Sequence, residues 1–238
     1  MALRFYRGLN SEIQALSFDL DDTLYYNEDV IRNAERAQFE AVSELLPNHK
    51  NNEMPFWLEL KWQVAKSHPE LCHNVTAWRR KVITSGLAQL GMLEDEIGEA
   101  AEQVFARFYH ARSDFSVPQQ TFDVLRALRQ RYPLVAVTNG NVDIDRVGLS
   151  PYFVGYYRSG ENQTRMKPHP DMLHLVCQHL DLNAESVLHI GDNEFTDVGS
   201  AHRAGCASLW FNPNGRRLKT PCLPDGEYSD LDDLLQLL

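Results

Sequence analysis

The feature that most constrains this chain is a series of short apolar runs, each of which stops abruptly at polar or turn-forming residues. The runs cover residues 13–20, 134–140, 186–192 and 206–211, and segments with helical apolar spacing lie between the later ones. Runs of this length are too short for buried helices and predict buried parallel strands. Strands that alternate with helices of about ten residues indicate βαβ units. The expected fold class is therefore α/β, with a Rossmann-like parallel sheet covered by helices on both faces.

A helical block interrupts this alternation. Its apolar residues recur at helical spacing in four segments, 30–46, 56–65, 75–90 and 97–109. Prolines and a glycine separate the segments, as expected between helices. We therefore expect two domains, an α/β core formed by residues 1–24 and 114–238, and a domain of four helices inserted at 25–113.

The inserted block contains three tryptophans and a basic run. Trp57, Trp62 and Trp78 stand at helical spacing, which predicts core side chains. The run 79–81, Arg-Arg-Lys, follows Trp78 directly and predicts a solvated face; the alternative is a patch that steers a phosphate toward a site.

The charge balance is acidic. Lysine and arginine number 23 and aspartate and glutamate 33, so the formal net charge is −10. An apolar fraction of 43% and an aromatic fraction of 10% are typical of a globular chain and not of a disordered one. A protein that binds nucleic acid through phosphate contacts usually carries the opposite charge, so we expect no nucleic-acid partner.

Localisation is predicted from segments that the sequence lacks. No run approaches the roughly 18 consecutive apolar residues of a membrane span, and the N-terminal segment has no apolar stretch of about 7–15 residues that would suit a signal peptide. The cysteines, Cys72, Cys177, Cys206 and Cys222, form no CxxC pair, which argues against a zinc site or a disulfide framework. We expect a cytoplasmic protein with no membrane partner, and we make no prediction of its oligomeric state.

The first apolar run ends in two aspartates, Asp19 and Asp21, one residue apart. In open α/β sheets the functional site lies at the carboxyl ends of the strands. In an extended strand both carboxylates would project to the same side. Adjacent carboxylates repel each other unless a proton or a cation separates them. An isolated pair of this kind is at least as often a surface acidic turn.

The other strand ends carry complementary groups. Thr138 offers a hydroxyl, and the backbone N–H groups around Asn139 could bind an anion. Lys167 offers a positive charge just before a predicted helix. Asp192 ends the third run, and Asp197 follows five residues later.

These groups together fit a cation and a phosphoryl group. Asp19 and Asp192 could hold one divalent cation, and a phosphoryl group would lie between that cation, Thr138 and Lys167. Hard oxygen ligands at a mostly aqueous site favour Mg²⁺. The pattern therefore indicates phosphoryl transfer.

Four neighbouring residues carry weaker predictions. Gly191 is expected to permit a tight turn at the strand end. His189 is expected to pack around its strand, because no HxH or HExxH spacing points to metal ligation. Tyr25 and Tyr26 follow the aspartate pair, and we expect one of them to face the site.

The same motifs carry a family resemblance. DLDDT (19–23), TN (138–139), KP (167–168) and GDNEFTD (191–197), in this order, resemble the four motifs of the haloacid dehalogenase superfamily, whose members are mostly Mg²⁺-dependent phosphatases. The match spans the predicted core, and the inserted helices look like the four-helix cap of that superfamily. The resemblance implies a small phosphorylated metabolite as the substrate.

The resemblance also implies catalytic roles. Asp19 would be the nucleophile that forms an aspartyl-phosphate. Asp21 would be the general acid for the leaving group and then the base for water. Thr138 would bind a phosphoryl oxygen with help from the backbone N–H of Asn139, and Lys167 would offset the negative charge.

The metal ligands follow from the same resemblance. Asp19, the backbone carbonyl of Asp21, and Asp192 would bind Mg²⁺, and Asp197 would hold metal-bound water or support the site. The superfamily's dehalogenases lack the second aspartate of the pair, so Asp21 favours a phosphatase.

Several segments, including RFYRGL near the start and HIGDNEFTDVGSAHRAG near the third run, resemble one bacterial subgroup. That subgroup acts on FMN and on 5-amino-6-(5-phosphoribitylamino)uracil in riboflavin biosynthesis. The alternatives are a sugar-phosphate phosphatase, a phosphomutase and a non-catalytic protein that binds phosphometabolites. Asp21 speaks against the last, because binding alone does not need an acid/base residue.

Overall fold

The computed structural model describes residues 3–6, 8–9, 11–47 and 49–238. The chain divides into two compact units. The first, which we call the core unit, comprises Met1–Tyr26, Ser116–Gly140 and Val147–Leu238. The second, the helical unit, comprises Asn27–Phe115 together with Asn141–Arg146. The segment Asn141–Arg146 belongs to the predicted core range by sequence and clusters with the helices in the structure.

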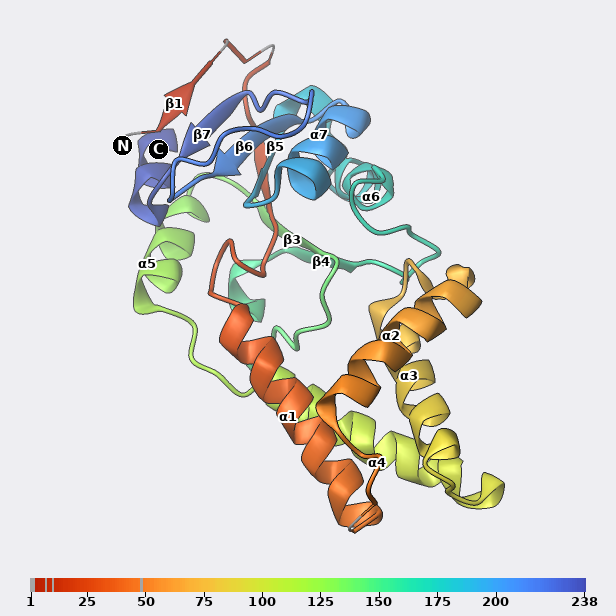
Figure 1. Cartoon of the computed structure of the whole chain (residues 1–238). Helices are drawn as coiled ribbons and strands as arrows, with labels where there is room; N and C mark the ends of the chain where they lie inside the picture. Colours follow the sequence, from red (N-terminus) through yellow and green to blue (C-terminus); the bar gives the residue numbers. More distant parts are fainter. Residues whose placement is uncertain (1–2, 7, 10, 48) are drawn as a thin grey trace. The chain divides into compact units, whose positions relative to one another are not determined.

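A seven-stranded sheet organises the described part of the core unit, in the order β1-β7-β6-β5-β2-β3-β4 (Figure 1). The strands are β1 (Arg4–Phe5), β2 (Ala15–Phe18), β3 (Leu134–Thr138), β4 (Gly155–Arg158), β5 (Val187–Gly191), β6 (Ala207–Phe211) and β7 (Gly226–Tyr228). All neighbouring pairs are parallel except β1 with β7. The predicted α/β class is confirmed, while the short antiparallel edge strand was not predicted.

The register of the sheet places the site. β2 lies between β5 and β3, so that Leu16 pairs with both Leu188 and Leu134. Every residue of β2, β3 and β5 is buried, as expected for central strands covered on both faces. The carboxyl ends of these three strands therefore meet side by side.

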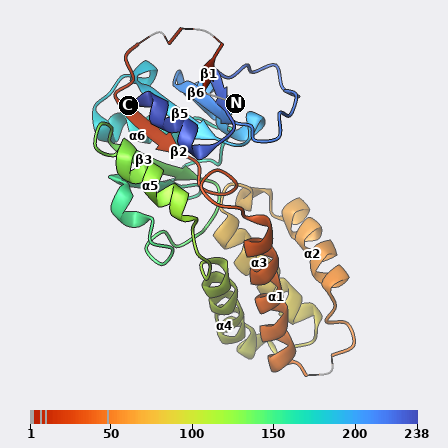
Figure 2. The same ribbon diagram turned by 90° about the vertical axis from the view of Figure 1, so that its left-hand side faces the viewer.

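Helices cover both faces of the sheet (Figures 1 and 2). α6 (Asp171–Leu180) and α7 (Gly199–Ala204) pack one face through apolar contacts with β3 and β5. α5 (Gln119–Leu128) lies on the opposite face with the C-terminal segment. That segment is a 3₁₀-helix, Leu231–Leu237.

The helical unit contains α1 (Glu28–Leu45), α2 (Met54–Ser67), α3 (Val75–Gln89) and α4 (Glu94–Arg112). Their buried faces form one apolar cluster around Trp57, Ile83 and Phe108. None of the helices among the described residues combines the length and the apolar character that a bilayer span requires.

Two predictions for this unit are wrong. Trp62 is 71% exposed, because α2 turns Trp57, Leu60 and Val64 inward and leaves position 62 on the outer face. Arg79 is only 4% exposed, because its guanidinium lies 4.3 Å from the centre of the Phe108 ring. The sequence Arg-Arg-Lys does not reveal that its first residue, Arg79 in α3, packs on an aromatic ring of α4.

Two helical glycines give a matched stability test. A Cβ atom at Gly86 in α3 would lie 2.3 Å from the Trp57 ring, whereas a Cβ atom at Gly98 in α4 would have no atom within 4 Å. We expect Gly86→Ala to lower the free energy of unfolding by about 1–3 kcal/mol through overpacking. Gly98→Ala should raise it by up to about 1 kcal/mol, since alanine is the better helix former. Denaturant unfolding followed by circular dichroism measures both, and a stabilising Gly86→Ala would contradict the packing described.

Candidate functional site

Asp19 directly follows the carboxyl end of β2. Its N–H donates to the carbonyl of Ile190 and so extends the pairing of β2 with β5 by one residue. The chain then turns, and the N–H of Asp22 donates to the carbonyl of Tyr25. The Tyr25 hydroxyl donates to Oδ1 of Asp21 over 2.7 Å. Tyr25 is buried and Tyr26 is 78% exposed. Tyr25 therefore orients the carboxylate of Asp21.

Lys167 is the centre of the site. Its ammonium group contacts Oδ1 of Asp19 at 2.6 Å, Oδ1 of Asp197 at 2.7 Å and the carbonyl oxygen of Val137 at 2.8 Å. An ammonium group has three N–H donors, and three acceptors surround this one. Lys167 is 2% exposed, so these contacts replace its hydration almost completely.

The backbone of Lys167 is held by the side chain of Asn139. Nδ2 of Asn139 donates to the Lys167 carbonyl at 3.0 Å, and the Lys167 N–H donates to Oδ1 of Asn139 at 2.7 Å. Thr138 is buried, and its Oγ1 accepts from the N–H of Gly140 at 2.9 Å. This contact leaves the hydroxyl proton of Thr138 able to donate to a ligand.

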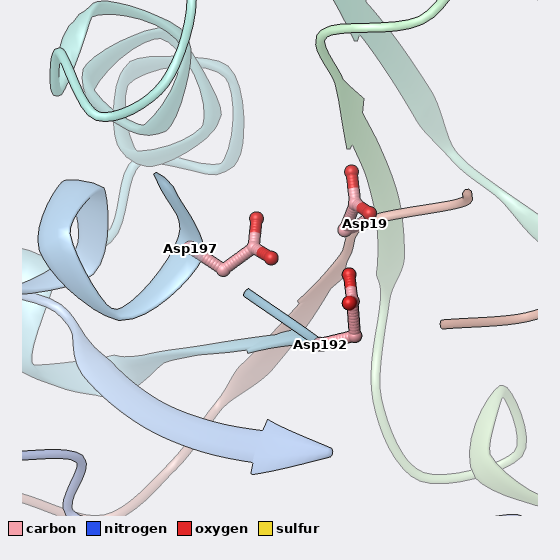
Figure 3. Close-up of side chains that lie close together, drawn as sticks. All are labelled: Asp19, Asp192 and Asp197. Atoms are coloured by element: carbon pink, nitrogen blue, oxygen red, sulfur yellow. The ribbon is translucent and has the colours of Figure 1, made fainter. Parts of the chain in front are cut away.

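Three carboxylates converge beside Lys167. Oxygen atoms of Asp19, Asp192 and Asp197 all lie within 4.8 Å of one another, and Figure 3 shows the three side chains turned toward a common space. The backbone carbonyl of Asp192 accepts from Nε1 of Trp210 and from Arg216, each at 2.8 Å. These two donors fix the turn that carries Asp192.

Gly191 makes the approach of Asp197 possible. A Cβ atom at Gly191 would lie 2.3 Å from Cγ of Asp197, closer than any real contact. Oδ2 of Asp197 accepts from the N–H of Asn193 at 2.9 Å, and Nε2 of His189 lies 3.5 Å from Oδ1. Gly191 has no left-handed φ, so its importance is the space it leaves and not the tight turn that was predicted.

The buried ammonium of Lys167 faces the buried carboxylates of Asp19 and Asp197, and the pKa values of these two aspartates shift in opposite directions. Burial raises the pKa of Asp19 well above its usual value, and the charges of Asp197 and Asp21 add to this effect. Although burial opposes its ionisation, contact with Lys167 holds the pKa of Asp197 low. Burial, followed by the charges of Asp197 and Asp22, raises the pKa of Asp192 to about 7.

This charge arrangement fits a divalent cation. The site carries more carboxylates than Lys167 can neutralise, and the raised pKa of Asp192 shows that Arg216, whose Nη2 lies 4.0 Å from Oδ2, does not offset its burial. Carboxylate oxygens are the ligands that Mg²⁺ prefers. Asp19 and Asp192 lie in the group of three as the metal prediction requires, with Asp197 as a third member. The carbonyl of Asp21 as a ligand and the supporting role of Asp197 stay predictions.

The structure brings the predicted site residues to the carboxyl ends of β2, β3 and β5. Sequence reasoning missed the contact between His189 and Asp197, the hydrogen bond at 2.9 Å between His189 Nδ1 and Ser17, and the two donors to Asp192. Ser17 and His189 are paired across β2 and β5, so their hydrogen bond can be expected only once the register of these strands is known.

Comparison with known proteins identifies hydrolases and phosphatases as similar to this chain. A family model described as haloacid dehalogenase-like hydrolase matches residues 13–205. The chain is 38% identical over 240 residues to 5-amino-6-(5-phospho-D-ribitylamino)uracil phosphatase YigB of Escherichia coli, covering 99% of this chain and 100% of that protein. It is 26% identical to phosphoglycolate phosphatase of Escherichia coli, covering 95% of this chain and 93% of that protein.

Among solved structures, the chain is similar to one described as 2-haloacid dehalogenase from Pseudomonas syringae. The TM-score is 0.88 and the identity 29%, with 94% of this chain and 97% of that chain covered.

The raised pKa of Asp192 predicts a pH-dependent stability. Between about pH 4 and pH 7 the folded protein holds a proton on Asp192 that the unfolded chain has lost, so the free energy of unfolding falls as the pH rises through this window. Without divalent cations, we expect the stability of the wild type relative to Asp192→Asn to fall by about 2–3 kcal/mol between about pH 5 and pH 8.

Adding Mg²⁺ at pH 8 should recover that loss in the wild type and much less of it in Asp192→Asn, because the cation replaces the proton. Urea unfolding with EDTA or with Mg²⁺ measures all four cases. A difference between the two proteins that stays constant with pH would contradict the electrostatics described.

Proposed function

The chain belongs to the haloacid dehalogenase-like hydrolase family and is a phosphatase, and from that premise we propose a mechanism and a substrate class. We infer that it hydrolyses small phosphomonoesters with Mg²⁺ through an aspartyl-phosphate on Asp19. The observation that carries this proposal is Asp21, which stands two residues after Asp19 with its carboxylate held by the Tyr25 hydroxyl. Displacing a halide needs no proton donor, whereas an alkoxide leaving group needs one.

The first step is attack by Asp19. Lys167 occupies Oδ1 of Asp19, which leaves the other carboxylate oxygen to form a bond to phosphorus. The bond between phosphorus and the ester oxygen breaks, and Asp21 donates a proton to the departing oxygen. Lys167 and the Thr138 hydroxyl stabilise the negative charge on the phosphoryl oxygens.

The second step releases phosphate. Asp21, now a carboxylate, takes a proton from water, and the water oxygen attacks phosphorus. The bond to Asp19 breaks and inorganic phosphate leaves. Splitting the displacement in this way replaces one difficult step by two easier ones.

The metal fits the same residues. Asp19, the carbonyl of Asp21, and Asp192 would hold Mg²⁺, which would neutralise charge on the phosphoryl group and on the clustered carboxylates. Asp197 holds Lys167 in place and lies beside the same space.

The proposed substrates are 5-amino-6-(5-phospho-D-ribitylamino)uracil and FMN, which share a phosphoribityl chain on a heterocycle. The 38% identity to YigB over nearly the whole of both chains supports this class. The proposal also places the protein in the cytoplasm, where riboflavin biosynthesis takes place.

Substitution of the aspartates tests the mechanism. We expect Asp19→Asn to abolish turnover and Asp21→Asn to lower kcat by about 10²–10⁴-fold. Tyr25→Phe should lower kcat by about tenfold, because the Asp21 carboxylate loses one charge-assisted hydrogen bond. Steady-state assays with Mg²⁺ measure these effects. Asp29 is an exposed aspartate, so Asp29→Asn is a matched control that should leave kcat unchanged. Turnover by Asp19→Asn at the wild-type rate would overturn the assignment of the nucleophile.

A screen of phosphorylated metabolites tests the substrate. We expect kcat/KM for the two phosphoribityl compounds to exceed that for sugar phosphates and phosphoglycolate, and activity to disappear with EDTA. A preference for a sugar phosphate would replace the substrate assignment, and transfer of phosphate to a second sugar instead of to water would indicate a phosphomutase. Binding of all compounds without hydrolysis would identify a non-catalytic protein.

A further inference from the structure

The helical unit contains a cavity of about 350 Å³ between α1, α2 and α3. It shares no residue with the candidate site. Its size lies within the range of about 300–1,000 Å³ that small-molecule pockets occupy. Most of its wall is apolar, formed by Phe39 of α1 and by Met54, Pro55, Trp57 and Leu58 of α2. Such a wall suits the apolar body of a ligand.

Polar groups gather at one part of the same wall. They are Glu35 and Gln38 of α1, Lys61 of α2 and Arg79 of α3. Lys61 and Arg79 both approach Oε1 of Glu35, the Arg79 Nη2 atom at 3.5 Å. Two cations thus share one carboxylate, which leaves a positive charge at this end of the cavity.

The guanidinium of Arg79 is incompletely satisfied. Its Nη1 donates to Oε1 of Gln38 over a long 3.4 Å, and within the described part of the chain its Nε has no hydrogen-bond partner. A buried donor without an acceptor costs free energy, and more so when the group is charged. The side chain of Arg79 is only 5% exposed, so bulk water does not solvate it freely.

Surrounding charges strengthen this demand for an anion. Burial lowers the pKa of Arg79, and the positive charge of Arg112 acts in the same direction. Burial also lowers the pKa of Lys61, and the charge of Arg79 adds to this effect. An anion that enters the cavity would stabilise the charged forms of both residues.

We propose that this cavity is a second binding site, which takes an organic anion with an aromatic or similarly apolar body and a single carboxylate-like group. The body contacts Met54, Leu58 and Phe39, and the anionic group accepts hydrogen bonds from Arg79 and Lys61. No residue of the cavity takes part in the proposed phosphoryl transfer, so this inference stands independently of the substrate.

Two probes with the same ring system test the proposal. 1-Anilinonaphthalene-8-sulfonate carries a sulfonate, and N-phenyl-1-naphthylamine is its uncharged counterpart. In fluorescence titrations of the full chain, we expect saturable one-site binding of the sulfonate and at least about tenfold weaker binding of the neutral probe, since charge-assisted hydrogen bonds are the strong ones. Equal affinities, or no saturable binding of the sulfonate, would overturn the proposal.

Variants locate the binding. Leu58→Trp should fill the cavity and abolish binding of both probes, and Met54→Trp provides a second filling variant if the first fails to fold. Lys61→Met should remove the preference for the sulfonate while retaining the neutral probe. Leu93→Trp adds the same ring at an exposed position of the helical unit that does not line the cavity, and it should bind both probes like the wild type.

Circular dichroism and phosphatase activity verify that each variant is folded, because none of these positions lies in the candidate site. Unchanged sulfonate binding in folded Leu58→Trp and Met54→Trp would show that the probe binds elsewhere and would overturn the assignment of the cavity.

Discussion

The buried ammonium group of Lys167 is the interaction on which the site depends. It contacts two carboxylates and a strand carbonyl, and it is almost completely removed from solvent. Burying a charge is costly unless it is paired and hydrogen-bonded, and removing one partner of a buried ion pair is strongly destabilising. Asp19 and Asp197 are therefore held in place by the same group that balances their charge, before any ligand binds.

This arrangement depends in turn on the sheet. Thr138 ends β3, and Asp19 and Asp192 directly follow β2 and β5. These strands are neighbours in space, although more than a hundred residues separate the first aspartate from the other two residues. Asn139 then holds the backbone of Lys167 through two hydrogen bonds, which ties a loop to the end of β3. Each charged side chain of the site thus either starts near a strand end or is held by a residue that does.

The sequence allowed prediction of the α/β class and of the residues that meet at the strand ends, because apolar runs and the polar residues that end them are local features. Contacts between distant segments were not predictable. Trp62 and Arg79 differ in exposure because of how α2 and α3 pack, and no local pattern distinguishes an outward tryptophan from an inward one. The role of Gly191 likewise depends on Asp197, which reaches it only after the chain has turned.

Two buried cations in this protein differ in how completely they are satisfied. Lys167 donates short hydrogen bonds to Asp19 and to the carbonyl of Val137, and it forms a close ion pair with Asp197. Arg79 has long contacts to Glu35 and Gln38 and an Nε without a hydrogen-bond partner among the described residues, and it lines a cavity while its guanidinium lies on the Phe108 ring. Because its charge is paired inside the protein, Lys167 positions Asp19 and Asp197, and in the proposed reaction it also stabilises the negative charge on the phosphoryl group. The charge of Arg79 is offset only in part by Glu35, and an anion in the cavity would add a second negative partner.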